Sequence, residues 1–152
     1  MASAVGAHVV AFTTPEDKAP DAMALGAHEV VLSRETGALT AQANRFDFLL
    51  DTVSGSYPMD AYVQALKLGG TICSLGLPAR FDLSPMNLAI GRRSEASSAA
   101  GGTRDTRDML AFCAEHGIVA DVEVITPADI NDGLAKLERN EVKYRLVIDM
   151  KS

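Results

Sequence analysis

The chain has 152 residues, of which 47% are hydrophobic and 22% are charged, so it is long enough to bury one hydrophobic core. Its formal net charge of −6, with no cation cluster beyond Arg92 and Arg93, argues against a nucleic-acid partner, because neutralising phosphates needs many cations on one face. No stretch approaches the roughly 20 apolar residues of a membrane helix, and the amino terminus lacks a signal-peptide pattern, so we expect a cytoplasmic protein without a membrane partner.

Short apolar runs alternate along the chain with longer stretches of helical periodicity, which is typical of parallel βαβ units. Near-continuous hydrophobicity predicts four strands, at residues 8–12, 29–32, 46–50 and 71–75. Such strands suit a sheet that helices cover on both faces. The predicted fold class is therefore α/β, with a mostly parallel, doubly wound sheet.

The first helix is predicted over residues 15–25. Thr14 is its expected N-cap, Pro15 fits the first helical position, and Gly26 is the expected C-cap. Pro20 lies inside this helix, where it would remove a backbone hydrogen bond and kink or delay the helix, at a cost of about 3 kcal/mol. Further helices are predicted at residues 36–43, 59–67 and 106–116.

The carboxyl-terminal stretch departs from strict alternation, and we expect it to belong to another layer. The elements predicted there are a strand at residues 120–125, a helix at 127–139 capped by Thr126, and a strand at 144–150. The last strand has alternating apolar residues, which suits a strand with one covered face.

The side chains that most often bind metals or act as nucleophiles form no recognisable pattern. Cys73 and Cys113 are far apart and belong to no CxxC pair. The histidines, His8, His28 and His116, lack the spacing of metal ligands. No GxSxG motif marks a nucleophilic serine, which counts against a hydrolase. The sequence therefore predicts neither a metal site nor a catalytic residue.

Several linked blocks carry a resemblance that spans nearly the whole chain. They read VGAHVVAFTTPEDKAPDAMALGAHEVV, FDFLLDTVSG, ALKLGGTICSLGLP, GRRS, MLAFCAEHGIVADVEVI and EVKYRLVIDM. Together they resemble the carboxyl-terminal half of zinc-type medium-chain alcohol dehydrogenases, of the NADP-preferring, cinnamyl-alcohol-dehydrogenase-like kind. The resemblance implies a Rossmann-like fold in which residues 1–120 are part of the NADP-binding domain. Residues 121–152 would form the strand-helix-strand that returns to the catalytic domain in this family.

Relative to that family, the chain begins after the first strand, the Gly-rich turn and the zinc ligands. We therefore expect a truncated sheet, with zinc only in a full-length parent. In the Rossmann order the family's first strand lies between the second and the fourth, so its absence would leave two neighbours unpaired. Those neighbours could close up, or another segment could fill the gap, and the strand at residues 144–150 is one candidate.

The end of the family's second strand selects between NAD and NADP, because an acid there accepts from the ribose hydroxyls whereas a 2′-phosphate repels it. Thr13 and Thr14 occupy this place, so no acid does. By resemblance, Thr13, Thr14 and Lys18 take the positions that hold the 2′-phosphate of NADP. Glu16 and Asp17 would weaken phosphate binding. On the residues alone, Thr14 is equally a helix cap and Lys18 equally a solvated helix residue.

Two turns follow presumed parallel strands, at the edge where open α/β sheets bind ligands. The resemblance assigns cofactor contacts in these turns to Asp51, Thr52, Val53, Gly76, Leu77 and Pro78. It adds Ser98, from the segment that presents the nicotinamide carboxamide, and Arg145, from the returning strand. Without the resemblance, Asp51 is a local cap and Gly76 a turn residue. Arg145 is then equally a solvated strand residue.

Residues 95–100 read EASSAA, where the family carries an apolar strand that also pairs across its dimer interface. We expect polar and small residues to replace that strand. Glu95 and the serines bring charge and polarity to the edge, which protects exposed edges from pairing. The family is dimeric, but with a polar edge strand a monomer is an alternative for this chain.

The leading functional hypothesis is the NADP(H)-binding portion of an alcohol dehydrogenase, whose parent would move hydride reversibly between NADP and primary alcohols or aldehydes. We expect the isolated chain to be inactive, because the chemistry needs the zinc of the missing half. The alternative is a non-catalytic α/β structural or interaction module that has lost nucleotide binding.

Overall fold

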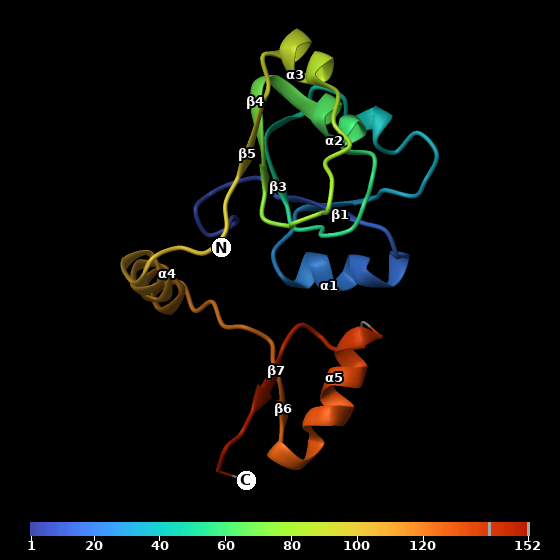
Figure 1. Cartoon of the computed structure of the whole chain (residues 1–152). Coiled ribbons are helices and arrows are strands. Elements are labelled where there is room, and N and C mark those ends of the chain that lie inside the picture. Colours follow the sequence, from blue (N-terminus) through green and yellow to red (C-terminus); the bar gives the residue numbers. More distant parts are fainter. Residues whose placement is uncertain (140, 152) are drawn as a thin grey trace. The chain divides into compact units, whose positions relative to one another are not determined.

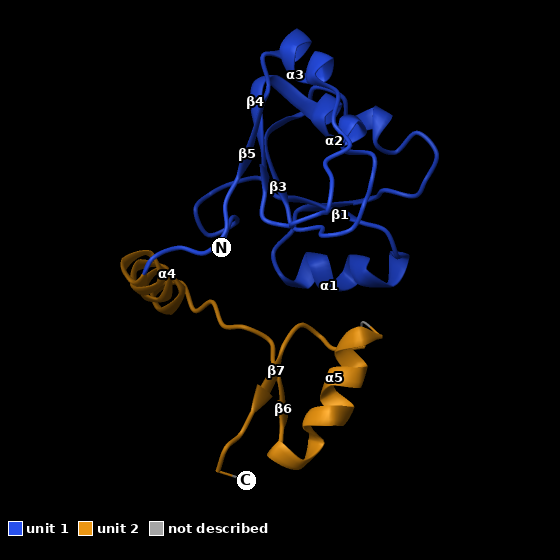
Figure 2. Ribbon diagram, viewed as in Figure 1, with its two compact units in different colours: residues 1–102 blue, residues 103–152 orange. Residues whose placement is uncertain are grey.

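The computed structural model describes residues 1–139 and 141–151, which divide into two compact units (Figure 2). Unit 1 is Met1–Gly102 and unit 2 is Thr103–Ser152. These units are defined by packing alone. The functional division at residue 120 therefore stays a prediction.

Unit 1 contains two parallel sheets (Figure 1). In the first, β1 (Val10–Thr13) pairs with β2 (Glu29–Leu32). In the second, β4 (Leu66–Ser74) lies between β3 (Phe46–Asp51) and β5 (Ser94–Ser97). Every pairing is parallel, which confirms the α/β class and the mostly parallel sheet.

The helical elements of unit 1 are short. They are the 3-10 helices η1 (Glu16–Lys18) and η2 (Thr40–Gln42) and the α-helices α1 (Ala19–Ala24), α2 (Met59–Ala65) and α3 (Pro85–Gly91). The prediction of one helix over residues 15–25 is wrong, because η1 and α1 divide that stretch. Pro20 consequently lies in the first turn of α1, where its missing N–H leaves no partner unsatisfied, and its expected cost does not arise.

Two other helix predictions fail at identifiable residues. Gly37 has a φ of 81°, which no right-handed helix contains, so only η2 forms within residues 36–43. Leu66 is extended, with ψ at 141°, so α2 ends at Ala65 and β4 begins five residues earlier than the apolar run predicted. The helix α3 was not predicted, although Pro85 marks its first position.

The core of unit 1 lies between α2 and the sheet β3-β4-β5. Met59 and Val63 of α2 and Leu66 and Ile72 of β4 are at most 1% exposed. Partly buried side chains that pack against them are Phe46, Leu49, Tyr57, Leu83 and Leu88. Because two of these come from the loops after β3 and β4, the core also holds the carboxyl ends of these strands in place.

The edge strand β5 corrects a prediction about residues 95–100. Polar and small residues were expected to replace the strand, yet Ser94–Ser97 pairs with Thr71–Ser74 of β4 in regular parallel register. Pairing of this kind uses backbone groups, so polar side chains do not prevent it, and an edge position tolerates their exposure. The oligomeric state stays a prediction.

The two sheets of unit 1 are joined through side chains. The ring of Phe12 on β1 makes edge contacts with Phe46 at 5.5 Å and Tyr62 at 5.4 Å between centroids. At the amino ends of the strands, Arg45 donates to both carboxylate oxygens of Glu29 at 2.6 Å. This hydrogen-bonded guanidinium, with a smaller effect of His8, holds the pKa of Glu29 below its usual value.

Unit 2 contains α4 (Thr103–Glu115), β6 (Glu123–Ile125), the 3-10 helix η3 (Pro127–Asp129), α5 (Ile130–Glu138) and β7 (Leu146–Ile148). β7 pairs in parallel with β6, in a sheet of its own. The hypothesis that residues 144–150 fill a gap in the main sheet is therefore wrong. The β6-α5-β7 unit supplies the partner strand locally, so these backbone groups are satisfied without the main sheet.

Two residues of unit 2, Thr126 and Gly133, have roles that its packing explains. Thr126 is the N-cap of η3, not of the single helix predicted at residues 127–139, and in its capping box its hydroxyl donates to Asp129 at 2.6 Å. Gly133 of α5 is buried, and a Cβ there would lie 2.8 Å from Leu146 and 3.0 Å from Ile125. The helix can therefore approach β6 and β7 closely. Throughout the described ranges, helices are too short or too polar to cross a membrane.

Candidate functional site

The carboxyl ends of β1 and β2 carry a group of hydroxyl side chains. Thr13 ends β1, Thr14 follows it, and Ser33 follows β2. The Ser33 backbone N–H donates to the Thr13 carbonyl at 2.9 Å, and the Ser33 hydroxyl donates to the same carbonyl at 3.3 Å. The hydroxyls of Thr14 and Ser33 are 3.3 Å apart. The strand register thus places a third hydroxyl beside the Thr14 hydroxyl and the Thr13 backbone carbonyl.

Lys18 adds a cation to the segment that follows these hydroxyls. It is the last residue of η1, and its side chain is exposed. Within residues 1–139 and 141–151, no carboxylate forms an ion pair with Lys18. Glu16 and Asp17 are in the same short helix, so the local charge is mixed. This arrangement offers hydrogen-bond donors to an anionic group, while the nearby carboxylates of Glu16 and Asp17 would repel it.

Asp51 organises the turn after β3. It is 8% exposed, and each of its carboxylate oxygens accepts a hydrogen bond, from the Val53 N–H at 2.9 Å and from the Tyr57 hydroxyl at 2.7 Å. Its backbone carbonyl accepts from the N–H groups of Leu75 at 2.7 Å and Gly76 at 3.2 Å. These contacts support the local-cap role of Asp51. They also fix the turns after β3 and β4 against each other.

Gly76 lies where the two turns meet, and it is buried. A Cβ built on Gly76 would overlap the backbone nitrogen, carbonyl carbon and carbonyl oxygen of Val53. Only a residue without a side chain allows this approach. The backbone N–H of Ser98 donates to the Ser74 carbonyl at 3.1 Å, so the end of β5 lies at the same edge.

The structure therefore brings most of the predicted site residues to carboxyl strand ends of unit 1. Thr13, Thr14 and Lys18 lie at the β1-β2 sheet, and Asp51, Thr52, Val53, Gly76, Leu77, Pro78 and Ser98 lie at the β3-β4-β5 sheet. Arg145 precedes β7 in unit 2, with an exposed side chain. The roles of all of these residues in cofactor binding stay predictions.

Three polar residues of this region were missed in the sequence. Ser33 had a usable signal, since it is the first residue after a strand predicted to pair with the one that ends near Thr13. Tyr57 and Ser74 had none, because their roles depend on contacts across the sheet. Ser74 is fully buried next to Asp51 in register, and its hydroxyl has no partner in the described parts of the chain.

The Tyr57 hydroxyl contributes stability that this site loses at alkaline pH. Burial, and then its hydrogen bond to the Asp51 carboxylate, raise the pKa of Tyr57 well above its ordinary value of about 10. A raised pKa contributes stability that is complete below about pH 10 and is lost as the pH rises toward the folded-state pKa. We expect Tyr57→Phe to reduce the loss of stability between about pH 9 and about pH 11, and to cost about 1–3 kcal/mol at neutral pH.

Urea unfolding at the two pH values measures this effect. Tyr144→Phe is the matched control, because Tyr144 is 54% exposed and belongs to unit 2. Equal alkaline losses in the unmodified chain and in Tyr57→Phe would contradict the assignment to Tyr57.

The side chains that the structure describes do not fit a zinc ion. Among the described residues, no group of three or more His, Cys, Asp or Glu side chains could hold a metal. A zinc site needs three or four such ligands around one point.

Comparisons with known proteins agree on one family. The profile of the family described as zinc-binding dehydrogenase matches residues 1–115. The chain is 48% identical over 151 residues to the aldehyde reductase YahK of Escherichia coli (strain K12), covering 98% of this chain and 43% of that protein. The chain spans about two fifths of the length of the curated relatives it matches.

Solved structures give the same result for the fold. A cinnamyl alcohol dehydrogenase from Sorghum bicolor superposes with a TM-score of 0.92 at 31% identity, over 97% of this chain and 42% of that one. A cinnamyl alcohol dehydrogenase from Helicobacter pylori, complexed with NADP(H), gives 0.83 at 28% identity, over 99% of this chain and 43% of that one. The Rossmann-like assignment is thus confirmed.

Proposed function

Because this chain belongs to the zinc-binding dehydrogenase family, we propose that it is the NADP(H)-binding portion of an alcohol dehydrogenase. The observation that carries the proposal is the set of hydroxyl side chains at the carboxyl ends of β1 and β2, with Lys18 in the helix that follows β1. Hydroxyls and a cation suit a phosphate, whereas an acid at the strand end would suit ribose hydroxyls. Thr13 and Thr14 occupy that strand end, so the site favours NADP over NAD.

The remaining contacts would come from the turns that Asp51 holds together. We propose that the backbone of Thr52, Val53, Leu77 and Pro78 lines the cofactor, since both turns lie at the edge where open α/β sheets bind ligands. Gly76 supports this role, because the absence of its side chain brings the turns into contact. Ser98 and Arg145 are the further predicted contacts. NADP(H), when bound, supplies or accepts the hydride in the reversible conversion of primary alcohols and aldehydes.

The proposed parent is a longer enzyme of this type. Support comes from the names of relatives, which include an aldehyde reductase and a cinnamyl alcohol dehydrogenase complexed with NADP(H). The residues of this chain would bind and orient the nucleotide. The described residues contain no group of three or more His, Cys, Asp or Glu side chains that could hold a metal to activate an alcohol or aldehyde, so we expect no NADPH-dependent aldehyde reduction by this chain alone.

Lys18→Ala tests the proposal directly. Cofactor fluorescence measures the binding, and we expect NADPH to bind the unmodified chain saturably. The Kd should be about tenfold higher in the variant, because a charge-assisted contact to phosphate is lost. Binding of NADH, which lacks the 2′-phosphate, should be unaffected by the substitution. Lys151→Ala is the matched control, since it removes an exposed lysine from unit 2.

The same titration decides between the proposal and its alternative. If NADPH produces no saturable change, the chain is a structural or interaction module of the α/β class without a nucleotide site. If NADPH binds Lys18→Ala and Lys151→Ala equally strongly, the proposed nucleotide site is retained, but the contact between its 2′-phosphate and Lys18 is rejected.

A further inference from the structure

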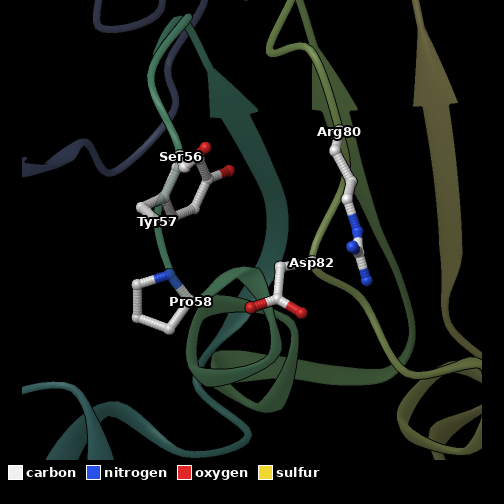
Figure 3. Close-up of a pocket in the computed structure, with 5 residues that line it drawn as sticks. All are labelled: Ser56, Tyr57, Pro58, Arg80 and Asp82. Carbon is white, nitrogen blue, oxygen red and sulfur yellow. The ribbon is translucent and has the colours of Figure 1, made fainter.

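A pocket of about 500 Å³ opens between the loops that follow β3 and β4. Figure 3 shows its lining residues, with Ser56, Tyr57 and Pro58 on the first loop and Arg80 and Asp82 on the second. These residues follow the turns assigned to the cofactor, but none of them belongs to that assignment. A pocket of this volume can take a small organic ligand.

The two loops are held in place on both sides of the pocket. The Tyr57 hydroxyl donates to the buried Asp51 carboxylate at 2.7 Å, which orients the tyrosine ring. The Ser84 N–H donates to Asp60 Oδ1 at 2.8 Å, which ties the second loop to the start of α2. Leu83, which precedes Ser84, packs against the core. The Tyr57 ring and the backbone of the second loop are therefore held in place, which lowers the part of the entropic cost of binding that comes from ordering them.

The charged residues of the pocket have unused hydrogen-bonding capacity. Throughout residues 1–139 and 141–151, no hydrogen bond or ion pair involves the side chain of Arg80 or that of Asp82. A guanidinium only donates and pairs best with an oxyanion, while a carboxylate only accepts and needs a donor. Tyr57 and Pro58 offer ring surfaces on the opposite loop, across the pocket from Asp82 and Arg80 (Figure 3).

We propose that this pocket binds a small planar ring compound that carries an oxyanion at one end and a hydrogen-bond donor at the other. Arg80 pairs with the oxyanion, Asp82 accepts from the donor, and the ring lies against Tyr57 and Pro58. The oxyanion is a carboxylate or a phosphate, since a guanidinium pairs with either. This site is separate from the proposed NADP(H) site and does not depend on it.

A titration of the 152-residue chain with model ligands, monitored through its amide NMR signals, tests the proposal. 4-Aminobenzoate and 4-aminophenyl phosphate supply both groups and distinguish the two oxyanions, whereas benzoate lacks the donor and aniline lacks the anion. We expect saturable shifts at Ser56, Tyr57, Arg80 and Asp82 with at least one of the first two ligands. Benzoate and aniline should bind about tenfold more weakly, because each leaves one charged group without its partner.

Two substitutions separate the roles of the charged residues. Arg80→Gln should raise the Kd of the bifunctional ligand about tenfold. Asp82→Asn should do the same for that ligand, yet leave benzoate binding unweakened, since benzoate offers no donor. Arg107→Gln and Asp121→Asn are the matched controls, because both residues are exposed and belong to unit 2.

Several outcomes would overturn the proposal. They are a lack of saturable shifts with either bifunctional ligand, equal affinity for all four compounds, and unchanged affinity in Arg80→Gln. Displacement of the bifunctional ligand by AMP or by NADPH would show that the pocket is one end of the nucleotide site. Conversely, if the chain binds the bifunctional ligand but does not bind NADPH, the proposed cofactor is rejected and the proposal for this pocket is retained.

Discussion

Gly76→Ala is expected to lower the free energy of unfolding by about 3 kcal/mol and to abolish saturable NADPH binding. The added Cβ would overlap the backbone of Val53, and backbone atoms cannot rotate away as a side chain can. The turn after β4 would have to move, which breaks the hydrogen bonds from Leu75 and Gly76 to the Asp51 carbonyl. Those bonds hold together both turns that we assign to the cofactor.

Gly55→Ala is the matched control, because Gly55 belongs to the neighbouring turn and a Cβ there would meet no atom within 4 Å. We expect its effect on unfolding to stay within about 0.5 kcal/mol, with NADPH binding retained. Urea denaturation and cofactor titration of both variants make the measurement. A Gly76→Ala variant as stable as Gly55→Ala would mean that the close approach of the turns is not required.

Leu66→Ala should cost about 2–5 kcal/mol, because it removes a fully buried side chain from the centre of the core. Leu66 contacts the cluster that joins α2 to β4, so the cavity would lie where the helix ends and the strand begins. A domain has only about 5–15 kcal/mol of stability in total. The loss is therefore a large part of what keeps unit 1 folded.

Leu68→Ala provides the comparison on the same strand, since Leu68 is 64% exposed. It removes the same atoms from a largely solvated site and should change stability by no more than about 0.5 kcal/mol. Urea denaturation of the two variants tests the difference. Equal losses would show that the core does not lie where α2 meets β4.

The strands could be predicted because their signal is local. β2 occupies the predicted residues 29–32, and β3 and β4 contain most of the predicted apolar runs. A parallel strand under a helix needs apolar, β-branched residues in succession, so the run itself marks the strand. The ends were less predictable. Leu66 is apolar in either a helix or a strand, and its packing on the core decides that it is extended.

β5 shows the opposite limit of sequence-based prediction. Its side chains are polar and small, which argued against a strand, yet Thr71–Ser74 of β4 offers a row of backbone partners. The strand forms because its neighbour is in place, and its own side chains contribute little. Likewise, β7 pairs with β6 and not with the main sheet, since the connection through α5 brings these two strands side by side.

The residue order alone determined the α/β class, the resemblance to the dehydrogenase family, and the strand-end hydroxyls of Thr13 and Thr14. The α/β class follows from backbone preferences and hydrophobic runs, which act over a few neighbouring residues, whereas the resemblance rests on several linked sequence blocks. The tertiary structure decided that Ser33 joins those hydroxyls, that Tyr57 bonds to Asp51, and that Arg80 and Asp82 share a pocket. Such contacts join residues that are distant in the chain, so they depend on strand register and on how loops pack at the sheet edge.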